Sequence, residues 1–198
     1  MFVTGIVLAA GASRRLGQPK QLLPYRGTTL LGSTLDLARR CCFDQLLVTL
    51  GGAAAAVLDR VDLSAAQVVD NPEFGEGCGS SVKTAVGRVD SRADGVVLLL
   101  GDQPGVAVRS VYDLVASVGA APIGACRYSD GLGHPFWFSR AMFVELGALH
   151  GDRAVWKLLH SGSYEVTELP VDAEAPIDVN TWDDYQSLLS QDQMSAPR

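Results

Sequence analysis

The sequence predicts an α/β fold, a three-layer sandwich around a mainly parallel sheet. Short, continuously apolar runs are typical of strands that are covered on both faces. They alternate with longer segments whose apolar residues recur at helical spacing, and the connections between them are short. Strands that alternate with helices in this way build a parallel sheet with helices on both sides.

Each expected element follows from its own pattern, in chain order. The apolar runs predict strands over residues 3–9, 46–50, 67–69, 95–100 and 123–126. Residues 134–138 are expected to add an antiparallel strand. Helical spacing predicts helices over residues 29–40, 53–61, 80–89 and 108–118, and two further helices over residues 152–160 and 182–191.

Length and composition favour one folded unit. The chain has 198 residues, 47% of them hydrophobic and 19% charged, which is enough for one substantial core. No internal repeat and no linker rich in Pro, Gly or Ser divides it. We therefore expect a single domain over residues 1–190 and a frayed tail over residues 191–198.

The charge balance argues against some partners. With a formal net charge of −6 and a pI near 5.0, the chain lacks the basic face of a general nucleic-acid binder. No apolar run approaches the roughly 20 residues of a membrane helix, and no signal peptide is apparent. The four cysteines and three histidines lack the spacing of a zinc site. We expect a soluble, cytoplasmic protein with reduced thiols.

The segment after the first predicted strand reads AGASRRLG over residues 10–17 and is followed by Lys20. Gly11 allows the backbone to approach a ligand, and Arg14, Arg15 and Lys20 supply cations for more than one phosphate. No GK[ST] follows, so the loop is not a P-loop. The alternative is an ordinary glycine turn followed by solvated basic residues.

Two carboxylates follow apolar runs. Asp102 lies directly after residues 95–100, within the sequence Gly-Asp-Gln-Pro, and Asp178 follows Ile177. Mg²⁺ is commonly held by one or two carboxylates together with substrate phosphates. The alternative for both residues is a turn or helix-capping role.

A glycine-rich loop precedes the predicted helix at residues 80–89. Gly77, Ser80 and Ser81 could border a base or ribose, or they could form a flexible connection with serine as the N-cap. In parallel sheets ligands bind at the carboxyl ends of the strands, where all these features are expected to lie. No persuasive Ser–His–Asp set or activated cysteine accompanies them. The combination favours metal-assisted phosphoryl or nucleotidyl transfer.

Several motifs resemble those of one family. Residues 8–17, LAAGASRRLG, with Lys20 and the following LLP resemble the signature of molybdenum-cofactor nucleotidyltransferases. Residues 101–104, GDQP, match that family's second motif, and 133–135, 151–153 and 177–181 resemble its later ones. The resemblance covers most of the chain and implies a Rossmann-like nucleotidyltransferase fold that uses an NTP and Mg²⁺.

The resemblance also implies roles for individual residues. Ala9, Ala10 and Gly11 would lie against the base, and Gly77, Ser80 and Ser81 on the base and ribose side. Arg14, Arg15 and Lys20 would bind the triphosphate, with Arg15, Lys20 and Asp102 as the catalytic set. Asp102 and Asp178 would hold Mg²⁺, while His134 and Asp152 would lie on the acceptor side. Asn180 stands where many relatives have an acidic residue and is given no metal role. Gln103 replaces a commoner Met without clear consequence.

The implied reaction is attack by the phosphate of molybdopterin on the α-phosphorus, with release of pyrophosphate. Ala9-Ala10-Gly11 points to CTP, because the Ala10 methyl narrows the base pocket where guanylyltransferases carry glycine. Three alternatives stay open. They are a GTP-dependent guanylyltransferase, a sugar- or isoprenoid-phosphate nucleotidyltransferase, and a non-catalytic module that delivers cofactor to a molybdoenzyme. A dinucleotide-binding dehydrogenase is disfavoured because no G-x-G-x-x-G follows the first strand.

Overall fold

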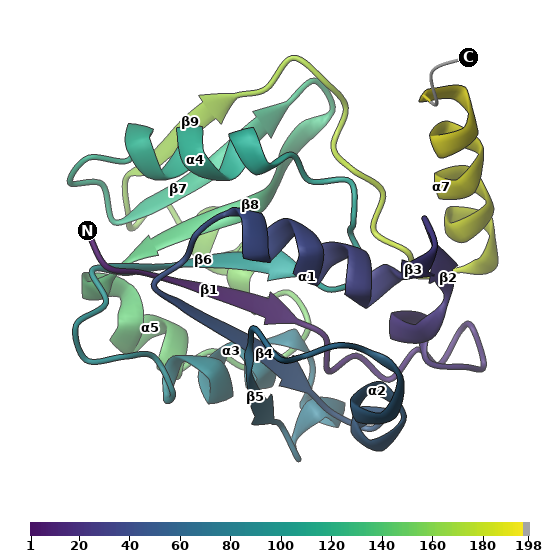
Figure 1. Cartoon of the computed structure of the whole chain (residues 1–198). Helices are drawn as coiled ribbons and strands as arrows, with labels where there is room; N and C mark the ends of the chain where they lie inside the picture. The colour runs from purple at the N-terminus through teal and green to yellow at the C-terminus, as the bar shows by residue number, and fades with distance from the viewer. Residues whose placement is uncertain (196–198) are drawn as a thin grey trace.

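A seven-stranded sheet forms the centre of the protein (Figure 1), as seen in a computed structural model that describes residues 1–195. The strand order is β5-β4-β1-β6-β8-β7-β9. Strand β8 runs antiparallel to β6 and β7, and the other neighbouring strands are parallel to each other. The bounds are β1 Val3–Leu8, β4 Gln45–Leu50, β5 Gln67–Asp70, β6 Gly95–Leu100, β7 Ile123–Tyr128, β8 Gly131–Ser139 and β9 Val166–Pro170. This confirms the mainly parallel sheet and the antiparallel strand near residues 134–138.

Helices cover both faces of the sheet, so that the three-layer prediction is also confirmed (Figure 1). One hydrophobic cluster joins Val7 and Val97 of the sheet to α1, α2 and α4. The other joins Ile6 and Leu98 to α3, α5 and α6. Successive strand residues point to opposite faces, which is why neighbouring residues such as Ile6 and Val7 enter different clusters. The helices are α1 Leu30–Arg40, α2 Ala54–Arg60, α3 Cys78–Val86, α4 Val108–Ser117, α5 Phe143–Gly147 and α6 Ala154–Leu159.

Local chemistry sets the helix ends that bear on the site. Thr29 is the N-cap of α1, because its hydroxyl accepts a hydrogen bond from the Gly32 N–H at 3.0 Å. Helix α3 begins at Cys78, two residues before the predicted start, and follows Gly77, whose φ is +97°. It ends at Val86, three residues short of the prediction, where Gly87 follows. Glycine weakens a helix, which favours an end at this point.

The sequence patterns missed an edge strand, a short helix and the two strands of a hairpin. Strand β9 is a half-exposed edge strand, and α5 is only five residues long. A small hairpin of β2 Pro24–Tyr25 and β3 Thr28–Thr29 has two residues in each strand. Such short or polar segments carry little periodicity for a pattern to detect.

Helix α7, Trp182–Ser195, is longer than predicted. The frayed tail was expected from residue 191, but the helix continues through residues 191–195, where no Gly or Pro interrupts it. Residues 196–198 of that predicted tail lie outside the described residues. Tyr185 and Leu188 pack with Leu23 and Tyr25, and the Tyr185 hydroxyl donates to the Pro24 carbonyl at 2.6 Å. These contacts attach α7 to the β2–β3 hairpin, beside the site end of the sheet (Figure 1).

The order of the strands makes the carboxyl ends of β1 and β6 the switch point of the sheet. From β1 the chain proceeds to β4 and β5 on one side, and it then returns to form β6 on the other side of β1. The connections therefore leave β1 and β6 in opposite directions, and ligands of open α/β sheets bind at such a switch point. Among residues 1–195, no helix has the length and apolar character needed to cross a membrane.

Candidate active site

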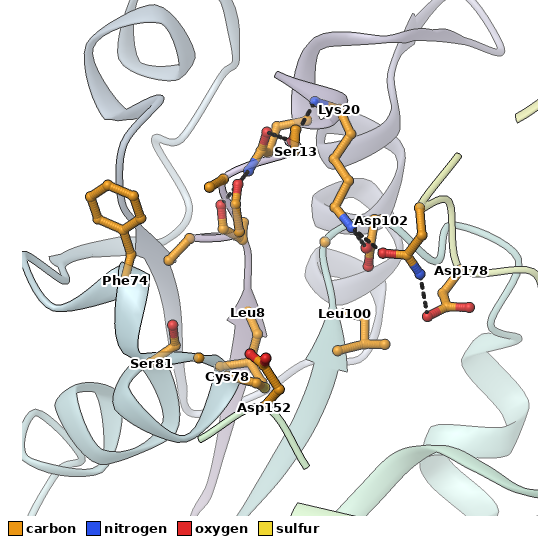
Figure 2. A pocket seen from close by; sticks show the side chains of 18 of the residues that line it. Leu8, Ser13, Lys20, Phe74, Cys78, Ser81, Leu100, Asp102, Asp152 and Asp178 are labelled. Carbon is orange, nitrogen blue, oxygen red and sulfur yellow. Dashed lines mark hydrogen bonds and ion pairs between the residues drawn. The ribbon is translucent and has the colours of Figure 1, made fainter. Parts of the chain in front are cut away.

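A cavity of about 480 Å³ lies at the carboxyl ends of β1 and β6 (Figure 2). That volume is within the usual range for small-molecule sites. Every site residue expected from the sequence lines it apart from Ser80. Those residues are Ala9, Ala10, Gly11, Arg14, Arg15, Lys20, Gly77, Ser81, Asp102, His134, Asp152 and Asp178.

The loop after β1 is held by a buried side chain, Gln21, that sequence reasoning missed. The Gln21 amide donates to the Ala9 carbonyl at 2.7 Å and to the Gly11 carbonyl at 2.9 Å. The backbone N–H of Lys20 donates to the Ser13 hydroxyl at 3.0 Å, which closes the loop on itself. Arg14 and Arg15 are exposed and form no ion pair within residues 1–195. Gln21 fixes the loop backbone while both guanidinium groups remain able to bind an anion.

Four polar side chains form a connected row across the cavity. The Lys20 ammonium forms an ion pair with Asp102 and donates to the Asn180 Oδ1 atom at 2.9 Å. The Asn180 amide nitrogen donates in turn to the Asp178 Oδ2 atom at 3.0 Å. Figure 2 shows the dashed contacts that lead from Lys20 past Asp102 to Asp178. Residues from three distant parts of the chain thus meet at one wall.

Backbone contacts hold the Asp178 segment against the turn that carries Asp102. The Val179 N–H donates to the Asp102 carbonyl at 3.0 Å. The Gln103 amide donates to the Pro176 carbonyl at 2.5 Å. Gln103, for which the sequence offered no role, therefore clamps residues 176–179 beside β6. The two carboxylates share the cavity because of these contacts.

Burial makes the Asp102 charge costly. Desolvation raises the pKa of this carboxyl above its ordinary value, the Lys20 ammonium partly opposes the rise, and the nearby Asp178 carboxylate adds to it. The Lys20 and Asp102 side chains are 14% and 13% exposed, so water screens them poorly. A cation beside Asp102 therefore stabilises the site.

The residues at this wall fit a divalent metal that is shared with a phosphate. Residues 1–195 contain no cluster of three or more His, Cys, Asp or Glu side chains that could hold a metal ion. A metal at this wall therefore needs ligands from a substrate or water as well. Asp102 and Asp178 supply two carboxylates in the cavity that the basic residues of the β1 loop also line. Mg²⁺ and similar hard cations accept one or two carboxylates when phosphates and water complete the shell.

The glycine-rich loop packs against the segment that carries Asp152. A Cβ atom at Gly77 would lie 2.6 Å from the Asp152 backbone nitrogen, and one at Gly79 would lie 2.8 Å from the His150 backbone. The Ser80 hydroxyl is buried, and its single hydrogen is shared between the Glu73 and Gly77 carbonyls, at 2.9 and 2.8 Å. Ser80 therefore holds the loop and does not line the cavity, in contrast to Ser81.

The Asn71 side chain, also missed from sequence, orders the same loop. Its amide nitrogen donates to the Ser80 and Ser81 hydroxyls at 3.0 Å each, and its oxygen accepts from the Glu73 N–H at 3.0 Å. Asn71 directly follows β5 and is fully buried. An Asn-Pro pair after a strand is a turn signal that could have indicated this role.

The remaining wall contains rings and a thiol. Burial lowers the pKa of His134 to about 3, so the ring is neutral near pH 7. Its centroid lies 4.1 Å from that of Phe136, and Trp156 lines the cavity nearby. Burial, with Asp102 and Asp152 close by, raises the pKa of Cys78 to about 11. The Cys78 thiol thus stays protonated, and a protonated thiol is a poor nucleophile.

Comparison with solved structures identifies close likenesses. Rv0371c from Mycobacterium tuberculosis H37Rv is 56% identical, with a TM-score of 0.91, and the match covers 96% of this chain and 98% of that one. A manganese complex of Rv0371c is 53% identical, with a TM-score of 0.88, and the match covers 96% and 99%.

Sequence relatives carry different names. The molybdenum cofactor cytidylyltransferase of Escherichia coli K12 is 28% identical over 185 residues, which are 91% of this chain and 92% of that protein. Nicotine blue oxidoreductase of Paenarthrobacter nicotinovorans is 36% identical over 129 residues, 65% of this chain and 63% of that protein. The match thus spans less than two thirds of that relative's length.

The family model for the MobA-like NTP transferase domain matches residues 5–167. The matched range includes the β1 loop, the Asp102 turn and the glycine-rich loop, and it ends before Asp178 and α7. With the parallel sheet and the cavity at its switch point, the match confirms the resemblance seen in the motifs. The chain belongs to the MobA-like NTP transferase family and is a nucleotidyltransferase that acts on nucleoside triphosphates.

Proposed function

We propose that the enzyme transfers CMP from CTP to the phosphate of a molybdopterin-type acceptor and releases pyrophosphate. The observation that carries this proposal is the meeting of the basic β1 loop, Asp102 and Asp178 in one cavity. Cations and carboxylates together suit a metal-bound triphosphate, whose transfer depends mainly on positioning and on neutralising charge. The relative named as a cytidylyltransferase supports the choice of substrates.

In this proposal the triphosphate lies along the loop after β1. Arg14 and Arg15 can each offer two parallel N–H donors to phosphate oxygens, and Lys20 offers a compact charge. The loop backbone is held by Gln21, so its N–H groups keep their directions without the nucleotide. Fixed donors of this kind need little rearrangement as negative charge shifts toward the leaving pyrophosphate.

Asp102 and Asp178 are the residues we propose as ligands of Mg²⁺. When bound, the metal would neutralise phosphate charge and make the α-phosphorus more electrophilic. The manganese complex of Rv0371c supports the use of a divalent cation. Asp102 keeps its place through the Val179 N–H bond to its carbonyl, and Asp178 through the donated Asn180 amide.

We propose that the nucleobase lies beside Ala9, Ala10 and Gly11. The first two residues are buried, and the Phe74 side chain forms another part of the cavity wall. A Cβ atom at Gly51 would lie 2.6 Å from the Ala10 carbonyl and 2.7 Å from Phe74, so these walls are closely packed. The Ala10 methyl then favours a pyrimidine, although one such group is worth only about 1–3 kcal/mol of discrimination.

The acceptor is proposed to enter near His134 and Asp152. His134 is neutral near pH 7, so its ring can bind an acceptor group without adding charge. A phosphate acceptor is already ionised at neutral pH, and its attack needs no strong general base.

We further propose that the reaction takes place in the cytoplasm, where the four free cysteines would stay reduced. We also propose that a molybdoenzyme receives the product.

The test is a pyrophosphate-release assay with each of the four NTPs in Mg²⁺, with molybdopterin, a sugar phosphate, an isoprenoid phosphate or no acceptor. Release that requires CTP and molybdopterin is the expected result. Release with GTP alone among the nucleotides would assign a guanylyltransferase, and release with a sugar or isoprenoid phosphate would reassign the acceptor. Tight binding of CTP and molybdopterin without turnover would identify a delivery module.

A further inference from the structure

The side chain of Asn180 joins the nucleotide loop to the carboxylate wall. Its oxygen accepts from Lys20 at 2.9 Å, and its amide nitrogen donates to Asp178 at 3.0 Å. The Asn180 backbone N–H also donates to the Asp184 carboxylate at 2.9 Å. A lysine can only donate and a carboxylate can only accept, so the two partners fix the orientation of the amide.

Lys20 is the counter-ion of Asp102. It forms the ion pair with Asp102 while it donates to Asn180, and both charged side chains are nearly buried. The row Asp102–Lys20–Asn180–Asp178 therefore contains two carboxylates and one ammonium. With one of the carboxylate charges compensated by Lys20, the row attracts a divalent cation less strongly than two free carboxylates would.

We propose that Asn180 is a positioning residue that keeps Lys20 on Asp102 until a triphosphate binds, so that metal and nucleotide bind together. This inference rests on the proposed function for the identity of the anion. A bound triphosphate offers the Lys20 ammonium an anionic partner in place of Asp102. Lysine has three N–H donors, so one of them can stay on Asn180 during this exchange. The Asp102 carboxylate is then available as a ligand.

The amide is suited to this task because it is neutral. An aspartate at position 180 could still accept from Lys20, but it would lose the donor to Asp178 and would add a third carboxylate to the row. The row would then contain two negative charges in excess of Lys20. A divalent cation would then be attracted even without nucleotide.

The experiment measures binding of Mn²⁺ alone to the full chain, from the electron paramagnetic resonance signal of free Mn²⁺. The Kd of Asn180→Asp is expected to be at least about tenfold lower than that of the wild type, since a nearly buried charge acts through a low dielectric. Asn180→Ala changes no charge but removes the acceptor that keeps Lys20 on Asp102, so its Kd for Mn²⁺ alone is expected to fall about threefold. The matched control is Gln186→Glu, which adds the same charge at an exposed position of α7 and should stay within about twofold of the wild type.

A second variant and a second measurement separate charge from folding. Lys20→Met removes the counter-ion, so it should also bind Mn²⁺ more tightly alone, by about the same factor. After correction for the Mn²⁺–CTP complex measured without protein, adding CTP should lower the Mn²⁺ Kd of the wild type at least about tenfold, and that of Asn180→Asp by clearly less. Thermal melting of each variant establishes that it is folded.

Three results would overturn the inference. They are Mn²⁺ binding by folded Asn180→Asp, Asn180→Ala and Lys20→Met that is no tighter than that of the wild type, equal tightening by Gln186→Glu, or wild-type binding of Mn²⁺ that is as tight alone as with any of the four NTPs. The measurement with metal alone needs neither nucleotide nor turnover. Absence of pyrophosphate release with every NTP would therefore overturn the proposed function and leave this measurement valid.

Discussion

Replacing Asp102 with asparagine tests the proposed metal site most directly. Asparagine has nearly the same shape, and its oxygen can still accept from Lys20, but the negative charge is lost. Asp102 is one of two carboxylates proposed as ligands, and it is 13% exposed at the side chain. The change therefore removes a charge from the wall of the cavity with little change in packing.

The expected loss of activity is large. A metal that neutralises phosphate charge contributes several kcal/mol to the transition state, and about 1.4 kcal/mol corresponds to a factor of ten in rate. If the loss of one of two carboxylates forfeits about 4 kcal/mol of that effect, pyrophosphate release falls about 1000-fold. Binding of CTP without metal should not weaken, because Arg14, Arg15 and Lys20 remain and a negative charge has left the cavity wall.

Although its activity falls, the Asp102→Asn protein should have a free energy of unfolding equal to that of the wild type or higher. Burial raises the pKa of Asp102 in the folded protein despite Lys20, so the folded state binds this proton more tightly than the unfolded chain does. The stability from this group is then present below the unfolded pKa of about 3.9 and is lost as the pH rises through the folded value. At pH 7 the Asp102→Asn protein, which has no charge to bury, should melt at the wild-type temperature or above it.

The assay pairs pyrophosphate release at saturating Mg²⁺ with thermal melting at pH 7. An inactive protein with undiminished stability supports a carboxylate kept for function at a cost in stability. Activity above about 1% of the wild type would refute the assignment of Asp102 as a metal ligand, because the loss would then be below about 2.7 kcal/mol. A markedly lower melting temperature would instead show that the Lys20–Asp102 ion pair mainly holds the fold.

Two further predictions concern residues of the same cavity. Gly77→Ala forces a Cβ atom into a backbone with φ of +97° and within 2.6 Å of the Asp152 nitrogen, so it should destabilise the protein by about 1–3 kcal/mol in denaturant unfolding. Gly75→Ala, with open space around its Cβ, is the control, and equal losses in both would contradict the packing argument. His134 has a pKa lowered to about 3 by burial, so its contribution to stability is present above the unfolded pKa of about 6.5 and is lost as the pH falls toward the folded value. His134→Gln should therefore lose less stability than the wild type between about pH 6.5 and 4, and identical acid titrations of the two proteins would exclude this role.

The sheet could be predicted because its strands are buried on both faces. Residues 95–100 are expected as a strand and form β6 with the same bounds, since an unbroken apolar run has no other stable place in a fold of this kind. Strand β9 carries Glu168 and is half-exposed, so it lacked that signal. Its place at the edge of the sheet depends on pairing with β7.

The charged residues of the candidate site could be predicted from the sequence, but the polar residues that hold them in place could not. The glycine, arginine and aspartate residues that follow apolar runs indicate a ligand edge by rule, and all of them line the cavity. Ser80 is the one predicted site residue that does not. Three supporting residues were missed, namely Gln21, Asn71 and Gln103. The sequence does not show whether the amide of an Asn or Gln side chain is buried or exposed. Only the contacts made by each amide distinguish the two.

The sequence by itself determined which residues carry charge and which runs must be buried, because both follow from the side chains and their spacing. The tertiary structure decided which of those charges meet. Lys20, Asp102 and Asn180 are far apart along the chain, and they come together because β1 and β6 are neighbours and α7 begins beside their carboxyl ends. The Asn180 side chain links the Lys20 ammonium to the Asp178 carboxylate only because it lies within hydrogen-bond distance of both. The local sequence around Asn180 does not determine those distances.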